Sequence, residues 1–126
     1  MQTAPKSIHY NREARLLTLT WSDALAHELS AEFLRVHSPS AEVRGHGIGQ
    51  SILQTGKKNV SISGLEPAGR YALKIIFDDG HDSGLYDWTY LRSLGDNKQA
   101  LWQEYLDKLA ETGQSRESMF ISVKQL

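Results

Sequence analysis

The feature that most restricts the fold is an alternating run over residues 70–78. Every second side chain in this run is large and apolar, namely Tyr71, Leu73, Ile75 and Phe77. A period of two places alternate side chains on opposite faces of a β-strand. A single amphipathic strand is not stable alone, because its backbone needs neighbouring strands and its apolar face needs a covering layer. The chain must therefore fold around a β-sheet.

Three further strands are predicted. Residues 7–10 and 15–21 are short segments rich in β-forming residues, and residues 11–14 between them favour a turn, so together they indicate a hairpin. Residues 59–64 form another alternating run. A turn is expected at residues 66–69, where proline at the second position fixes φ. These strands can pair with the run at 70–78 in an antiparallel arrangement.

Two helices are predicted after the strands. Asp87 is placed to cap a short helix that Gly95 stops. Asp96 precedes a longer amphipathic segment, residues 97–112, which ends at Gly113. Strands first and helices last are typical of an α+β domain, here with one twisted, largely antiparallel sheet followed by C-terminal helices.

Two stretches are less regular. Residues 25–36 show helical spacing and also a strand-like alternation, and the local pattern alone favours a helix. Residues 38–58 have no apolar periodicity and contain four glycines, which indicates a long loop of the kind that is either functional or disordered. We expect a single domain over residues 1–126 with its core at 7–113, and residues 114–126 as a short strand or a frayed tail.

The composition excludes several classes of protein. The 126 residues include no cysteine, so thiolate metal sites, disulfides and cysteine nucleophiles are absent. The formal net charge is −1 and the basic residues are spread evenly, which argues against nucleic acid as a partner. We find neither a signal-peptide pattern nor an apolar run of membrane-spanning length, so no membrane association is expected and a cytoplasmic location is predicted.

The most suggestive polar stretch covers residues 78–88, which carry four carboxylates and one imidazole. The carboxylates are Asp78, Asp79, Asp82 and Asp87. Their spacing does not match a calcium-binding helix-loop-helix, which needs alternating ligands and a glutamate at position twelve. Ordinary turn chemistry, which is rich in Asp and Gly, is an equally good explanation.

A metal site built on histidine is the second possibility. His81 lies in this turn. Further candidate ligands are Glu42 and His46 in the loop at 38–58 and His37 just before it. If the loop folds over the strand end, three imidazoles and a carboxylate would converge on a site suited to zinc or iron. The alternative is that His81 is a hydrogen-bonding residue at the tip of the turn.

The sequence contains no complete catalytic motif. Residues 45–49 lack the register of a dinucleotide-binding loop, and no serine lies in a nucleophile elbow. We therefore expect no enzyme activity; the remaining catalytic possibility is His81 as a general base oriented by Asp79 or Asp82. Five aromatic residues are expected in the core rather than in a partner-binding patch: Tyr86, Trp88, Tyr90, Trp102 and Tyr105.

Four stretches, residues 19–23, 33–47, 66–73 and 79–88, resemble the domain at the N-terminus of gamma-butyrobetaine hydroxylase and trimethyllysine hydroxylase. The resemblance covers about residues 7–113. It implies a small mixed fold on a twisted sheet, and it favours a strand over residues 28–37 in place of the helix that the local pattern indicates.

The resemblance also implies a function. In the hydroxylases the domain is a structural appendage that holds zinc through three cysteines and one histidine, and these positions correspond here to Ser38, Ser40, Val43 and His81. Neither a protonated hydroxyl nor valine is a normal zinc ligand. We therefore expect a non-catalytic accessory or interaction domain with an unidentified protein partner. The alternative is a metal-binding protein that uses the histidine set, and the fusion of some family members to iron–sulfur carrier ATPases points toward metal biology.

Overall fold

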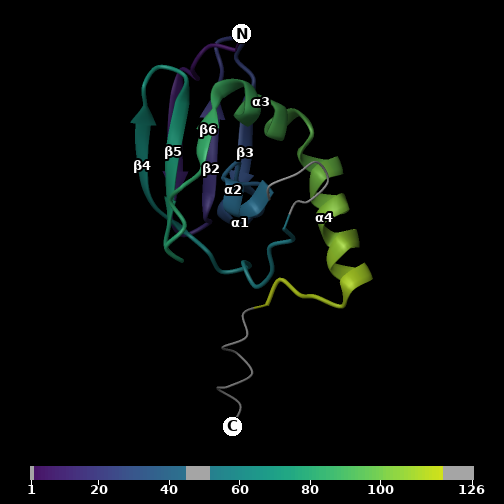
Figure 1. The fold of residues 1–126 in the computed structure, drawn as a ribbon. Coiled ribbons are helices and arrows are strands. Elements are labelled where there is room, and N and C mark those ends of the chain that lie inside the picture. The colour runs from purple at the N-terminus through teal and green to yellow at the C-terminus, as the bar shows by residue number, and fades with distance from the viewer. Residues whose placement is uncertain (1, 45–51, 118–126) are drawn as a thin grey trace.

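Six strands and four helices build an α+β fold in the computed structural model, which describes residues 2–44 and 52–117 (Figure 1). The strands come first along the chain, except that two short helices follow the third, and the two longer helices come last. The longest helix, α4 (Lys98–Thr112), lies along one side of the strands (Figure 1). The predicted fold class is confirmed.

The first three strands form one antiparallel sheet in the order β1-β2-β3. They are β1 (Ser7–Asn11), β2 (Leu16–Thr20) and β3 (Ala26–Ser30). The predicted hairpin at the N-terminus is confirmed by pairs such as Tyr10 with Leu17. Leu17 also pairs with Leu29 of β3, and both side chains are fully buried.

The second antiparallel sheet has the order β4-β5-β6. It consists of β4 (Ile62–Ala68), β5 (Ala72–Phe77) and β6 (Leu85–Asp87). The alternation that predicted β5 matches its burial, because Leu73, Ile75 and Phe77 face the core.

The predicted turn at residues 66–69 is wrong. Pro67 lies within β4 and pairs with Leu73, and the chain turns only after Ala68, where Gly69 adopts φ 62°. Proline is compatible with this strand because β4 is the edge of its sheet, so the missing N–H breaks no ladder between two neighbours.

The two sheets share one hydrophobic core, so the single sheet predicted from the sequence is divided in two. Leu19 of β2 and Ile75 of β5 belong to the same buried cluster. A polar link joins the edges: the Tyr10 hydroxyl lies 2.7 Å from Ser61 Oγ and accepts a hydrogen bond from the Ile62 backbone N–H at 3.0 Å.

Residues 25–36 combine both predicted structures. β3 ends at Ser30, and α1 (Ala31–Val36) follows at once. The Ser30 hydroxyl accepts a hydrogen bond from the Phe33 backbone N–H at 3.0 Å and so caps the helix. The strand that the resemblance favoured over residues 28–37 is therefore wrong beyond Ser30. A four-residue helix, α2 (Ala41–Arg44), lies in the predicted loop.

The C-terminal helices agree with prediction except at one glycine. Asp87 caps α3 (Trp88–Asp96) by accepting a hydrogen bond from the Tyr90 N–H at 2.7 Å, and Gly113 ends α4 with φ 68°. Gly95 does not stop α3 but lies inside it. A Cβ atom there would come within 2.3 Å of His27 Nδ1, so the glycine permits close packing of α3 on β3. No helix among the described residues has the length and apolar character to cross a membrane.

Candidate functional site

The candidate site centres on His81, which lies in the connection between β5 and β6. The connection begins with a turn in which the Gly80 N–H donates to the Phe77 carbonyl at 3.2 Å, and Gly80 itself has φ 90°. The Phe77 N–H in turn donates to the His81 carbonyl at 3.0 Å. The imidazole therefore sits on a fixed backbone, and the side chain is only 3% exposed.

Two serine hydroxyls lie next to Nε2 of His81. Ser38 Oγ is 2.8 Å from this nitrogen and Ser40 Oγ is 3.4 Å from it. Both serines are buried and come from the short connection between α1 and α2. The Ser40 backbone N–H also donates to Ser38 Oγ at 3.3 Å, which holds the two serines in one tight turn.

The other ring nitrogen faces a carboxylate. His81 Nδ1 lies 3.3 Å from Glu42 Oε2, and the Ser83 hydroxyl donates to Glu42 Oε1 at 3.3 Å. Glu42 is on α2, so this contact joins the helix to the β5–β6 connection. Both nitrogens of the ring thus have polar partners, and every buried side-chain nitrogen and oxygen in the described part of the chain has a hydrogen-bond partner.

The structure brings together positions that the resemblance linked to zinc. Ser38, Ser40 and His81 are in contact, and Val43 is buried on α2 nearby in the sequence. These residues do not fit the zinc of the hydroxylase domains, because serine hydroxyls remain protonated and valine has no donor atom. Within residues 2–44 and 52–117, no group of three or more His, Asp or Glu side chains is arranged to hold a metal ion.

The other histidines of the predicted metal set are placed differently. His37 Nδ1 lies 2.9 Å from the Phe33 carbonyl, and its ring packs on Phe33 with centroids 4.6 Å apart. His37 lines a separate pocket that His81 does not line. His46 lies outside the described residues. Among the described members of the predicted metal set, only Glu42 contacts His81.

The four carboxylates of the turn do not gather into a site. Asp79 Oδ2 accepts from Arg35 Nε at 2.9 Å and from Lys57 Nζ at 2.6 Å. Asp78 Oδ1 accepts from the Ser61 N–H at 3.0 Å, and Asp87 caps α3. Each of these three has a structural role, which supports the turn-chemistry interpretation.

Ser38, His81 and Glu42 are connected in the order used by serine hydrolases: hydroxyl, imidazole and carboxylate. The residue that orients His81 is thus Glu42 rather than Asp79 or Asp82. A nucleophile must reach its substrate, however, and Ser38 is only 1% exposed. A Cβ on Gly84 would lie 2.4 Å from Ser38 Oγ, so backbone also covers the hydroxyl.

Burial controls the protonation of this centre. Desolvation lowers the pKa of His81, the positive charge of Arg35 lowers it further, and the carboxylates of Glu42 and Asp79 oppose both effects. The imidazole is therefore neutral at pH 7. One of its nitrogens donates a hydrogen bond and the other accepts one, which suits a Glu42 acceptor at Nδ1 and a Ser38 donor at Nε2.

The aromatic residues lie in the core, as predicted. Tyr86, Trp88 and Tyr105 are buried, and Tyr90 and Trp102 pack against the core. The Tyr86 hydroxyl donates to the Leu34 carbonyl at 2.5 Å, which ties β6 to α1.

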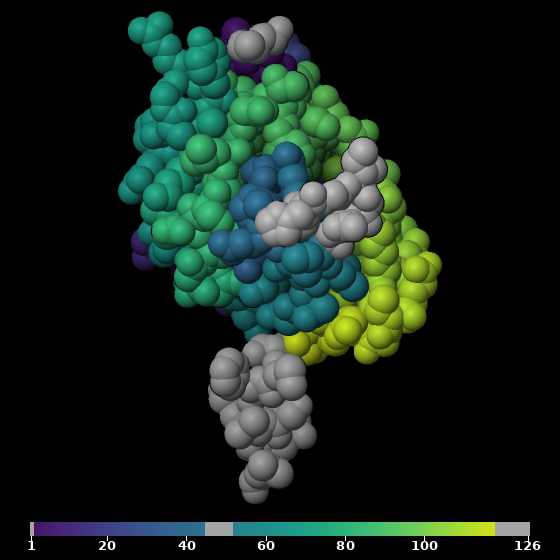
Figure 2. Space-filling model, in the orientation of Figure 1, coloured from purple at the N-terminus to yellow at the C-terminus, as the bar shows by residue number. Residues whose placement is uncertain are grey.

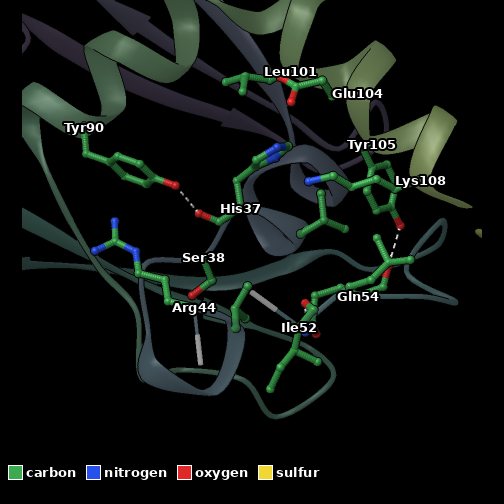
Figure 3. Close-up of a pocket in the computed structure, with 13 residues that line it drawn as sticks. His37, Ser38, Arg44, Ile52, Gln54, Tyr90, Leu101, Glu104, Tyr105 and Lys108 are labelled. Atoms are coloured by element: carbon green, nitrogen blue, oxygen red, sulfur yellow. Dashed lines mark hydrogen bonds between the residues drawn. The ribbon is translucent and has the colours of Figure 1, made fainter. Parts of the chain in front are cut away.

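A pocket of about 340 Å³ lies beside the His81 centre and was not predicted (Figure 3). It is formed where the stretch after residue 52 packs against α4 (Figure 2). The Tyr105 hydroxyl donates to the Gln54 carbonyl at 2.7 Å in this contact (Figure 3). Its lining comes from α1, α2, α3, α4 and residues 52–54. No local pattern in the sequence could have identified it, because the residues are brought together only by folding.

Comparison with known families gives a match to a family model. The model described as "Gamma-butyrobetaine hydroxylase-like, N-terminal" matches residues 8–92. No curated protein matches the chain.

Solved structures show the same fold. Two NMR solution structures are 51% and 44% identical to this chain, with TM-scores of 0.82 and 0.80. Each alignment covers 93% of this chain, together with 92% and 87% of the respective solved chains. A crystal structure of a protein of unknown function from Acidithiobacillus ferrooxidans ATCC 23270, assigned to the DUF971 family, is 34% identical with a TM-score of 0.62. That alignment covers 72% of this chain and 91% of the solved one.

Proposed function

This chain belongs to the gamma-butyrobetaine hydroxylase-like N-terminal domain family, and from that membership we propose that it is a non-catalytic accessory domain that acts by binding a protein partner. The observation that supports this role is the closed centre at His81. Its hydroxyls, imidazole and carboxylate contact one another, and the Ser38 and Ser40 side chains are buried.

The centre acts as a structural link in this proposal. It joins the connection after α1 to the β5–β6 connection through side chains. The resemblance implies that the hydroxylase domains hold a metal at these positions. Polar groups that satisfy one another in a buried position hold two segments in a unique arrangement. The chain would thus keep the shape of the appendage without needing zinc.

Two exposed apolar side chains, one at the start and one at the edge of the β5–β6 pair, are each suited to contact with a partner. Tyr71 is 62% exposed just before β5, and Leu85 is 53% exposed on the edge strand β6. Large apolar side chains near a sheet edge are typical anchors in protein interfaces. Neither side chain is itself part of the His81 centre.

The test is affinity capture from the source cells with the wild-type chain and a Tyr71→Ser/Leu85→Ser variant. We expect a partner that the wild type recovers and the variant loses, and that forms a defined complex with purified wild-type chain in analytical ultracentrifugation. His9→Ala, at an exposed position on the first sheet, is the matched control. Identical recovery by wild type and variant would contradict this contact surface, and the lack of any stoichiometric complex would contradict the accessory role.

Metal binding at His81 is the second candidate. The Glu42 carboxylate beside Nδ1 is favourable to it, because metal-binding imidazoles commonly donate their other N–H to a carboxylate. The test is elemental analysis of tag-free protein purified without chelator, with His81→Ala as comparison. About one equivalent of zinc or iron that the variant lacks would support this function. Equal metal content in both proteins would exclude His81 as the ligand.

A further inference from the structure

The pocket beside the His81 centre combines an apolar floor with a charged rim. Val36 and Val43 are buried in its floor, and Leu53 and Leu101 are half-buried there. The charged side chains Arg44, Glu104 and Lys108 are exposed at its edge. A concave site with apolar walls and a few convergent polar groups is typical of small-molecule binding sites. Its volume of about 340 Å³ is at the small end of their range.

The rim carries an excess of positive charge. Two cations, Arg44 and Lys108, face one carboxylate, Glu104, and the neighbouring His37 is neutral at pH 7 because burial lowers its pKa. Neither cation forms an ion pair with any residue of the described ranges. Two positive charges and one negative charge leave a net charge of +1, which favours a ligand with one negative charge.

Arg44 is held in place for such a ligand. Its guanidinium carbon lies 5.1 Å from the centre of the Tyr90 ring, so the side chain stacks on the aromatic face. Tyr90 is itself fixed, because its hydroxyl donates to the His37 carbonyl at 2.6 Å (Figure 3). A guanidinium that is already ordered loses less conformational entropy when it binds a carboxylate through two parallel hydrogen bonds.

We propose that this pocket binds a small monocarboxylic acid with an apolar body. The carboxylate pairs with Arg44, Lys108 adds to the positive potential, and the hydrocarbon part lies on the floor formed by Val36, Leu53 and Leu101. The pocket shares Ser38 with the His81 centre, but His81, Tyr71 and Leu85 do not line it, so ligand binding here does not depend on the protein partner proposed above.

The test is a titration of the full chain with hexanoate, followed by the backbone amide shifts in NMR. We expect saturable shifts at Val36, His37 and residues 101–108, with a dissociation constant of about 1 mM or tighter. Hexanamide, which has the same shape without the charge, should bind at least about tenfold more weakly. Arg44→Gln should weaken hexanoate binding by about fivefold or more and leave hexanamide binding unchanged.

Two further variants separate the pocket from general effects of charge. Leu53→Trp should fill the floor and abolish binding of both compounds, while Lys74→Gln, which removes a cation on β5 that does not line the pocket, should leave both unchanged. Equal affinity for hexanoate and hexanamide would overturn the carboxylate preference. An absence of shifts up to about 10 mM, or shifts outside the pocket, would overturn the site itself.

Discussion

Ser38 and His81 lie 43 positions apart in the sequence, and Ser38 Oγ is 2.8 Å from Nε2 of His81 in the folded chain. This contact joins the end of α1 to the β5–β6 connection. The resemblance to the hydroxylase domains implies that these two positions correspond to a thiolate and an imidazole on zinc. In this chain the two side chains contact each other directly.

Replacing His81 by alanine should destabilise the fold. The substitution removes the partner of two buried serine hydroxyls and leaves a cavity, so we expect a loss of about 2–4 kcal/mol in the free energy of unfolding. Urea denaturation measures the change. His9→Ala, at an exposed position of β1, serves as control and should shift stability by less than about 0.5 kcal/mol. An equally small effect at His81 would show that the centre contributes little to folding.

Restoring the cysteines should create a zinc site. The triple variant Ser38→Cys/Ser40→Cys/Val43→Cys supplies three thiolates at the positions that the resemblance links to zinc, and together with His81 they form a donor set that zinc binds tetrahedrally. We expect one bound zinc per chain, measured by elemental analysis and by competition with a chromophoric chelator. Adding His81→Ala to the triple variant should lower the affinity at least about tenfold. A triple variant that stays folded and metal-free would show that the backbone no longer permits the site.

Stability should fall in mild acid because of His81, which is buried, and His37, which is half-buried. Burial lowers the pKa of His81 and of His37, so each holds its proton less tightly in the folded chain than in the unfolded chain. As the pH falls below about 6.5, the unfolded chain is protonated first and gains stability relative to the fold. The free energy of unfolding continues to decrease until the pH reaches the lowered pKa values of the two histidines in the folded chain. Below those values it no longer changes through these groups.

Urea titrations between pH 7.5 and pH 5 test this prediction. The fall in stability should be smaller in His81→Gln and in His37→Gln than in the wild type, because glutamine does not titrate. His9→Gln is the control and should retain the full fall. A wild-type stability that is constant over this range would contradict the lowered pKa values.

Gly95→Ala should destabilise α3 although alanine is the better helix former. The new Cβ would lie 2.3 Å from His27 Nδ1, which accepts a hydrogen bond from Trp21 Nε1 at 3.0 Å. Moving His27 would break this bond to a fully buried tryptophan. Thermal unfolding should show a lower midpoint for the single variant.

The same substitution should have the opposite effect once His27 is removed. In a His27→Ala background the space is free, and Gly95→Ala should stabilise the helix by up to about 1 kcal/mol through helix propensity alone. The comparison of the four proteins isolates the contact between the two residues. If Gly95→Ala destabilises both backgrounds equally, His27 is not the reason for the glycine.

The sequence alone determined the elements whose signals are local. The alternation around Ile75 specified β5, Asp87 specified the start of α3, and Gly113 specified the end of α4, because strand periodicity and helix caps depend on residues close together in the chain. The resemblance on residues 33–47 and 79–88 also identified Ser38, Ser40 and His81 as positions of one site. Where two local signals competed, at residues 25–36, the sequence could not place the change from strand to helix at Ser30.

Only the tertiary structure decided which distant residues meet. Glu42 contacts His81, and His37 lines a separate pocket. Asp79 forms ion pairs with Arg35 and Lys57. Gly95 lies inside α3, where the absence of a side chain leaves room for the His27 ring. These outcomes depend on how the two sheets and α4 pack around one core, and packing contacts between residues far apart leave no periodic signal in the sequence.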